Sequence, residues 1–315
     1  MVLHGYGKEL VMEKKDLSIT EAFELYRVEQ IVYKNESART EEMHGLVLKL
    51  LLEFFGGDMP ISELTFDQIR KWKEWMQKNK KPNTVRGYII KLRVVIKHLQ
   101  LKGYPVINHE LIGIPKRDAT VVDFLEVDEV KKLIQASFKK SNGYSRFKRY
   151  RNRAMLSLLY SSGIRNGELC AINACQIKPG DNTFTIIGKG NKPRLCFMDD
   201  ETHKYIDEYM ALRKDNAPAL FISEQNKGAR ISNEVVQMVV KNCAEKAGLR
   251  KSVHPHTLRH TFATDLLRNN TNIVYVKEFL GHENIQTTMT YTHVVDEDLR
   301  AVHAKSHTTV VVATA

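Results

Sequence analysis

Apolar residues recur with a helical period along the first hundred residues. In the most regular stretch they stand three and four positions apart, at Val85, Tyr88, Ile89, Leu92, Val95, Ile96 and Leu99. This pattern predicts a helix that starts near Asn83 and ends before Gly103. Similar runs predict helices after a capping box at Ser18–Glu21, over Ser37–Phe55 and over Thr65–Met76. We therefore expect a small domain of four helices.

The pattern changes in the second half of the chain. Residues 183–187 and 194–197 are β-branched and apolar runs that predict two short strands around a glycine-rich turn. Helical periodicity predicts further helices over 126–137, 200–214, 233–247, 255–268, 273–280, 284–292 and 297–304. The expected fold class is mainly α with a small antiparallel β-sheet, in two domains.

Prolines and the loss of hydrophobic periodicity indicate where the domains begin and end. The stretch 105–122 contains Pro105 and Pro115 and no sustained period, which is typical of an interdomain linker. We expect a flexible arm over 1–16, a helical domain over 17–104, the linker over 105–122 and a larger domain over 123–306. The apolar tail 307–315 is either disordered or docked on another subunit.

Composition narrows the class of partner. The 315 residues carry a net charge of +11, which favours a polyanion such as nucleic acid or an anionic membrane surface, although a merely basic soluble enzyme fits as well. No apolar run approaches the ~20 residues of a membrane span, and the N-terminus lacks a signal-peptide pattern. The four cysteines are scattered, which predicts buried thiols in a reducing cytoplasm and neither disulfides nor a metal site.

The basic residues are unevenly distributed. Residues 71–117 hold twelve Lys or Arg against two Asp or Glu. Arg86, Arg93 and Lys97 share one face of the predicted 83–102 helix, opposite its apolar stripe. Such a face is usually only solvated, but the lack of balancing carboxylates favours a DNA-phosphate surface. Seven more basic residues lie in 139–153 among aromatic residues and are interpreted as a solvated or backbone-contacting loop.

Six residues spread over the second domain form a chemically coherent set. They are Arg165 in Ser162-Gly163-Ile164-Arg165, Lys189 in Gly188-Lys189-Gly190, His256 and Arg259 in His256-Thr257-Leu258-Arg259, His282 after Gly281, and Tyr291 nine residues later. Two arginines can bracket the oxygens of one phosphate with bidentate hydrogen bonds. A histidine can donate a further bond or move a proton, a tyrosine can attack, and a hairpin lysine can protonate the leaving hydroxyl.

Each of these residues also has a plain structural interpretation. A lone arginine is most often a surface residue, a lone tyrosine is most often half-buried packing, and Gly-Lys-Gly alone is a weak signal. Glu168 is either a solvent-exposed partner or a brace for Arg165. A chance match of all the segments in one order is much less frequent than any single match, so the set favours cleavage and rejoining of a phosphodiester without a metal.

At these motifs the sequence resembles the tyrosine recombinase, or phage integrase, family over about residues 17–306, and within it the two-domain Xer recombinases. The resemblance implies that Tyr291 is the nucleophile that forms a 3′-phosphotyrosine. It further implies that Arg165 and Arg259 clamp the scissile phosphate and that Lys189 is the general acid. His256 would assist proton transfer, His282 would bind the phosphate and Glu168 would support Arg165. Pro193 in the hairpin is a mild departure from the family pattern.

The resemblance also implies an architecture and partners. A helical core-binding domain and a catalytic domain would close on double-stranded DNA as a C-shaped clamp. A homotetramer, or a heterotetramer with a partner recombinase, would join two inverted-repeat sites through a Holliday junction without a cofactor. Residues 298–315, with Leu299 and Val302, would dock on a neighbouring subunit. Dimer resolution and integration or excision of a mobile element remain open, as do a topoisomerase-like enzyme and a non-catalytic DNA-binding protein as rivals.

Overall fold

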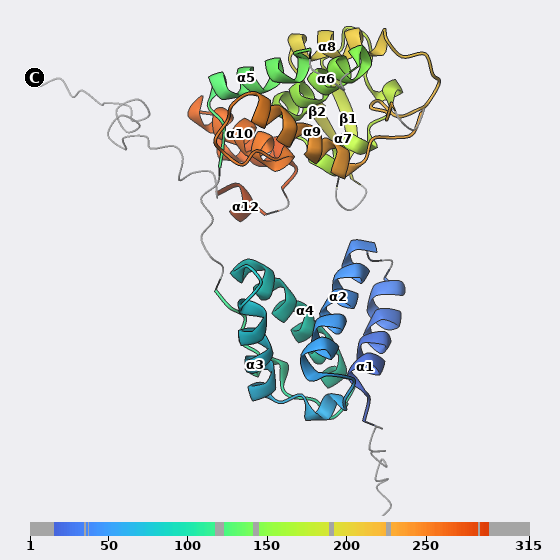
Figure 1. Ribbon diagram of the computed structural model, residues 1–315, viewed down its shortest axis with the longest axis vertical. Helices are drawn as coiled ribbons and strands as arrows, with labels where there is room; N and C mark the ends of the chain where they lie inside the picture. Colours follow the sequence, from blue (N-terminus) through green and yellow to red (C-terminus); the bar gives the residue numbers. More distant parts are fainter. Residues whose placement is uncertain are drawn as a thin grey trace, which may run out of the picture. The chain divides into compact units, whose positions relative to one another are not determined.

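The structure is a computed structural model in which the chain divides into two compact units, residues 1–120 and 121–315 (Figure 1). No helix in the described part of the chain is both long and apolar enough to cross a membrane. The described residues are 16–34, 36, 38–116, 123–140, 145–188, 192–224, 228–282 and 284–289.

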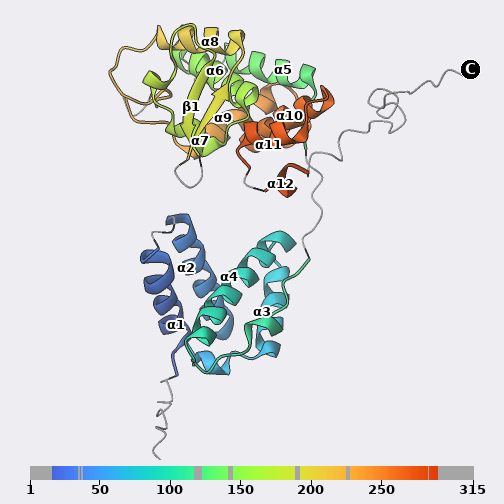
Figure 2. The same cartoon turned by 180° about the vertical axis from the view of Figure 1, so that it is seen from behind.

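The first unit contains the four predicted helices, in blue to teal in Figures 1 and 2. The capping box is confirmed, because the Glu21 N–H donates to Ser18 Oγ at 3.1 Å and the Ser18 N–H donates to Glu21 Oε2 at 2.9 Å. Helix α1 (Ile19–Tyr26) continues directly as a short π-helix, which the sequence pattern did not predict. The elements are α1 (Ile19–Tyr26), the π-helix η1 (Arg27–Val32), α2 (Ala38–Phe55), α3 (Phe66–Gln77) and α4 (Pro82–Leu101).

Helix α4 is the centre of this unit. All seven apolar positions that the sequence pattern singled out are buried, so the predicted register is confirmed. They pack with Trp72 of α3, whose Nε1 donates to the Leu50 carbonyl of α2 at 3.3 Å. Burying apolar side chains of this size contributes ~1.5–3 kcal/mol each relative to exposure, before the entropy of ordering is counted.

The segment that follows α4 packs on the first unit as far as residue 116. Ile112 is buried in the same core. Arg93 Nε donates to the His109 carbonyl and Arg86 Nε donates to the Pro115 carbonyl, each at 3.0 Å. The first part of the stretch expected to be a linker is therefore held by side chains of α4, whereas residues 117–122 lie outside the described residues.

The second unit confirms the mainly helical fold class with a small antiparallel sheet. The two strands pair with Thr183 opposite Phe197 and Ile187 opposite Pro193. The predicted helix over 284–292 is described only as α12, and the one over 297–304 lies outside the described residues. The elements are α5 (Val127–Phe138), α6 (Arg146–Ser162), α7 (Asn166–Ala171), β1 (Thr183–Ile187), β2 (Pro193–Phe197), α8 (Asp200–Met210), α9 (Asn233–Lys246), α10 (Pro255–Arg268), α11 (Ile273–Leu280) and α12 (Gln286–Met289).

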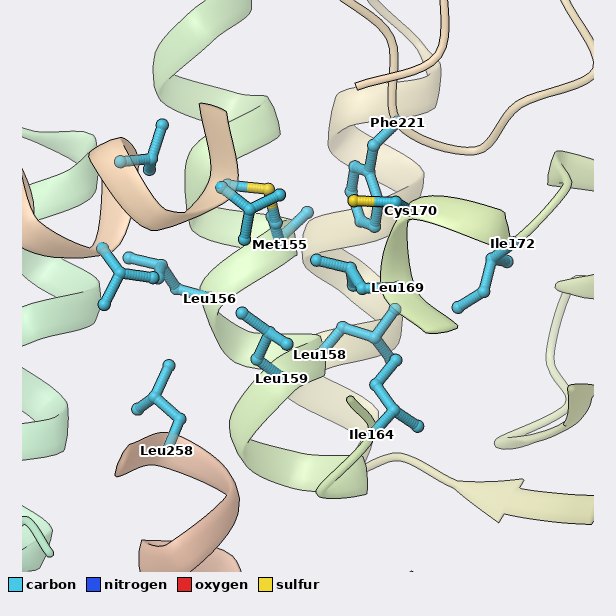
Figure 3. Packing of buried hydrophobic residues seen from close by; sticks show 14 of the residues in the cluster. Met155, Leu156, Leu158, Leu159, Ile164, Leu169, Cys170, Ile172, Phe221 and Leu258 are labelled. Carbon is cyan, nitrogen blue, oxygen red and sulfur yellow. The ribbon is translucent and has the colours of Figure 1, made fainter. Parts of the chain in front are cut away.

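Helix α6 is the central element of the second core and was missed in the sequence. Figure 3 shows its side chains Met155, Leu156, Leu158 and Leu159 among apolar residues of α7 and α10. The prediction of a loop over 139–153 is wrong for residues 146–153, which form the first turns of this helix. Arg151 is buried and donates to Asn152 Oδ1 and to the Ile222 carbonyl, so this arginine is a structural residue.

The cysteines are free thiols, as expected. Cys170, Cys196 and Cys243 are buried, but Cys175 is exposed, which corrects the prediction that all four are buried.

Candidate active site

Arg165 lies at the junction between α6 and α7. Gly163 ends α6 in the left-handed conformation, with φ +61°, and Ile164 is fully buried. Arg165 is then the N-cap of α7, and its backbone N–H donates to Glu168 Oε2 at 2.7 Å. This tight turn places the guanidinium of Arg165 against the end of α11, where Nη2 donates to the Gly281 carbonyl at 3.3 Å.

Glu168 braces Arg165, as one of the two interpretations of its role proposed. Arg165 Nη1 donates to Glu168 Oε1 at 2.8 Å, and the carboxylate side chain is only 9% exposed. Burial alone would raise the pKa of Glu168, but the Arg165 N–H and the guanidinium groups of Arg194 and Arg165 outweigh it and hold the pKa below its usual value. Glu168 is therefore an ionised carboxylate at neutral pH.

Arg259 is the most deeply buried charged group of the site. It lies on α10, is 3% exposed, and its Nη1 donates to the Gly163 carbonyl at 2.7 Å. Its Nη2 donates to the Leu280 carbonyl at 2.6 Å and lies 3.1 Å from His282 Nε2. One guanidinium thus joins the end of α6 to the end of α11.

The contacts of His282 determine its tautomer. A guanidinium only donates, so His282 Nε2 accepts from Arg259, and the neutral ring carries its proton on Nδ1. That proton is donated to Thr288 Oγ1 at 2.9 Å. Burial and the nearby cations Arg259, Arg165 and Arg194 lower the pKa of His282 to about 4, which agrees with a neutral ring.

We expect the free protein to keep His282 neutral in mildly acidic solution. Its pKa of about 4 lies below the usual 6.5, so the unfolded chain binds this proton first, and stability falls as the pH drops from 6.5 towards 4. Histidine-selective ¹⁵N NMR should show an Nδ1–H ring that titrates below pH 5. A ring that titrates near pH 6.5 would contradict the arrangement, and Thr288→Val, which removes the acceptor of Nδ1, is the control.

His256 lies one helical turn before Arg259 on α10, and its side chain is exposed. Partial desolvation lowers its pKa, and the cations Arg259 and Arg165 lower it further. A neutral, exposed imidazole near the two arginines can accept a proton. Arg165, Glu168, His256, Arg259 and His282 are therefore brought together, as the sequence predicted, whereas Lys189 and Tyr291 lie outside the described residues.

Arg194 was missed as a member of this cluster. It lies on β2 opposite Ile186 and faces inward, with its side chain 12% exposed. Its Nη2 donates to Glu168 Oε2 and its Nη1 to the Leu280 carbonyl, both at 3.0 Å. The signal was available in the sequence, because strand alternation places residue 194 on the same side as Cys196, and a cation on a core-facing position needs partners.

The balance of charge makes the cluster an anion site. Three guanidinium groups, those of Arg165, Arg194 and Arg259, surround the ends of α7 and α11. Glu168 is the carboxylate that pairs with two of them. With neutral histidines, the cluster keeps an excess of positive charge, which is suited to a phosphate. No group of three or more His, Cys, Asp or Glu among the described residues is placed to hold a metal ion.

The basic residues predicted to contact DNA lie in the first unit. Arg86 and Arg93 are half-buried, and their Nε groups donate hydrogen bonds to backbone carbonyls. They therefore hold the 105–116 segment against α4. Lys97 is exposed.

The chain is similar to known proteins over most of its length. The phage integrase family model matches residues 123–298. The tyrosine recombinase XerC of Thermodesulfovibrio yellowstonii is 34% identical over 245 residues, which cover 74% of this chain and 79% of that protein. The tyrosine recombinase XerD of Staphylococcus saprophyticus is 36% identical over 204 residues, covering 62% of this chain and 66% of that protein.

A solved structure shows the same fold. The XerH site-specific recombinase, bound to its palindromic difH substrate in a post-cleavage complex, superimposes with a TM-score of 0.71 at 21% identity. The match covers 87% of this chain and 81% of XerH.

Proposed function

Because the chain belongs to the phage integrase family of tyrosine recombinases, we propose that it cuts and rejoins DNA at specific sites through a 3′-phosphotyrosine intermediate. The observation that carries this proposal is the convergence of Arg165 and Arg259 on the end of α11, beside the neutral His282. This arrangement offers fixed donors and excess positive charge to one phosphate, which is what a phosphoryl-transfer site requires.

The proposed cleavage step exchanges one ester for another. The phenol oxygen of Tyr291 attacks the scissile phosphorus, the Tyr291 O–P bond forms, and the bond to the 5′ oxygen breaks. The phenol proton passes to His256, whose lowered pKa keeps it neutral and able to accept. Lys189 supplies a proton to the departing 5′ oxygen. The reverse sequence rejoins the strand, so the ester energy is conserved and no hydrolysis occurs.

The two arginines have the charge to stabilise this step. In the pentavalent transition state negative charge builds on the non-bridging oxygens, where Arg165 and Arg259 donate. Besides Glu168 and His282, their present acceptors include the Gly281, Gly163 and Leu280 carbonyls, which keep both guanidinium groups in place in the absence of DNA. Such preorganisation means that little reorganisation is needed when the phosphate arrives.

The first unit is proposed to hold the flanking DNA. Lys97 is the exposed member of the basic face, and Arg86 and Arg93 shape that face through the carbonyls they hold. We further propose a tetramer on two inverted-repeat sites and a Holliday junction. Residues 298–315, with Leu299 and Val302, are the proposed contact with a neighbouring subunit, and they lie outside the described residues.

Covalent trapping tests the proposed chemistry. Inverted-repeat duplexes that bind the protein are selected from a randomised library, and a nick near the scissile phosphate lets a short fragment diffuse away and trap the adduct. We expect DNA attached to Tyr291 by peptide mass spectrometry, and no adduct with Tyr291→Phe. Absence of any adduct on a tightly bound duplex would count against the proposal.

Two further readouts separate the finer possibilities. Joined products and a four-way junction on two such sites would support recombination by a tetramer. Relaxation of supercoiled DNA by a monomer, without joined products, would favour a topoisomerase-like enzyme.

A further inference from the structure

Arg194 is the one arginine of the cluster that the cleavage chemistry above does not use. Its guanidinium bridges three elements, because it starts on β2, reaches Glu168 on α7 at 3.0 Å and reaches the Leu280 carbonyl at the end of α11 at 3.0 Å. Arg165 is the N-cap of α7, and His282 directly follows Gly281, the C-cap of α11.

The backbone beside Arg194 is shaped to admit it. Gly281 adopts φ +61°, and a Cβ added there would lie 2.0 Å from Arg194 Nη1. A glycine is needed at this position both for the left-handed conformation and for the close approach of the guanidinium. Gly281 also supplies the carbonyl that receives Arg165 Nη2. The position of Arg194 and the position of Arg165 are thus coupled through one residue.

Charge gives Arg194 a second effect. Glu168 is 9% exposed and ionised, and its two oxygens are shared between Arg165 and Arg194. Without Arg194, Glu168 would have only Arg165 as its neutralising partner. The Arg165 guanidinium would then be drawn fully onto the carboxylate, and the charge that it offers to a phosphate would be largely cancelled.

On the basis of the proposed function, we propose that Arg194 is a positioning residue for DNA cleavage. By pairing with Glu168 and the Leu280 carbonyl, it keeps part of the charge of the Arg165 guanidinium available to the scissile phosphate. Arg165 keeps its own bond to Glu168, but because Arg194 shares that carboxylate, the charge of Arg165 is not fully neutralised. Arg194 acts through Glu168 and Arg165 and does not touch the DNA.

The first test compares two charge-conserving variants in the full-length protein. Arg194→Lys keeps the charge but loses the fork that holds two acceptors. Arg213→Lys is the matched control, because Arg213 is also buried and also holds one carboxylate, Asp215, and backbone carbonyls, those of Ala217 and Leu220, in a loop away from the cluster. Melting temperature and DNA affinity are measured alongside.

We expect Arg194→Lys to slow adduct formation on the nicked duplex about 10- to 100-fold with affinity within about threefold. Arg213→Lys should lower the melting temperature without slowing adduct formation. If wild type forms the adduct and Arg194→Lys forms it equally fast, the inference about Arg194 is wrong. If wild type forms none on bound DNA, the proposed function itself fails.

A double-mutant cycle with Glu168→Gln distinguishes positioning from a merely structural role. Removing the negative charge of Glu168 removes the pull on Arg165, so Arg194→Lys should then slow cleavage less than about threefold. The same 10- to 100-fold loss in both backgrounds would show that Arg194 does not act through Glu168.

A modified substrate identifies which catalytic group Arg194 serves. A duplex with sulfur in place of the scissile 5′ oxygen releases a thiolate, which needs no general acid because thiols are far more acidic than alcohols. The sulfur substrate should restore the cleavage rate of the Lys189→Met variant, whereas cleavage by the Arg194→Lys variant should stay slow. Restoration of Arg194→Lys would mean that it acts through the hairpin lysine, which would overturn the proposal.

Discussion

Replacing Arg259 with lysine should slow formation of the covalent protein–DNA adduct by about 10²- to 10³-fold, the usual cost of losing one preorganised transition-state donor. The guanidinium uses its fork to hold the Gly163 and Leu280 carbonyls and His282 Nε2 at the same time. A lysine ammonium is a point charge and cannot reproduce three directed bonds across this geometry. The positive charge would be kept, but the ammonium would lie away from the position where the guanidinium donates to the scissile phosphate.

The effect should fall on the rate and much less on DNA affinity, because binding energy is spread over many phosphate contacts. Single-turnover cleavage at saturating protein measures the rate, and a gel-shift titration measures affinity. Arg268→Lys is the control on the same helix, since Arg268 pairs with Glu126 at the surface and lies outside the cluster. Equal rates for Arg259→Lys and Arg268→Lys would remove Arg259 from the proposed machinery.

Replacing Gly163 with alanine should lower the free energy of unfolding by about 3 kcal/mol, through backbone strain and overpacking together. Gly163 adopts φ +61°, and an added Cβ would lie 2.3 Å from Cδ1 of the Phe262 ring. The ring is rigid, so either α10 moves or the α6–α7 turn opens. Both movements displace the Gly163 carbonyl from Arg259, so cleavage should fall with stability.

Two comparison variants separate the causes of this loss. Gly180 also has a positive φ, +73°, but a Cβ there would meet nothing within 4 Å, so Gly180→Ala should cost only the strain of ~1–2 kcal/mol. Phe262→Leu combined with Gly163→Ala should recover part of the larger loss by relieving the overlap. Denaturant titration of the wild type and the three variants provides the three losses of unfolding free energy, and equal losses at Gly163 and Gly180 would contradict the overpacking argument.

The elements that could be predicted from sequence are those specified by residues close to one another along the chain. The apolar stripe of α4 predicted all seven of its buried positions, and the Ser18 capping box predicted where α1 begins. Helix α6 was missed for a physical reason. It is buried on most sides, so its apolar residues form no single stripe, and its basic first turns have the composition of a surface loop.

The basic residues show most clearly what a sequence pattern cannot predict. A sequence pattern places Arg86 and Arg93 on a polar face, but it does not tell that their Nε groups hold carbonyls more than fifteen residues away. Arg194 was passed over for the same reason, because its two acceptors, on Glu168 and Leu280, are 26 and 86 residues distant along the chain.

The sequence by itself determined the helical class, the two-stranded hairpin and the family, because periodicity, caps and short motifs are written in neighbouring residues. It also indicated which residue types meet at the site. Only the tertiary structure decided that Arg259 is buried against two helix ends, that His282 carries its proton on Nδ1, and that Arg194 shares Glu168 with Arg165. These features depend on directed hydrogen bonds between distant segments, and their geometry exists only once the chain has folded.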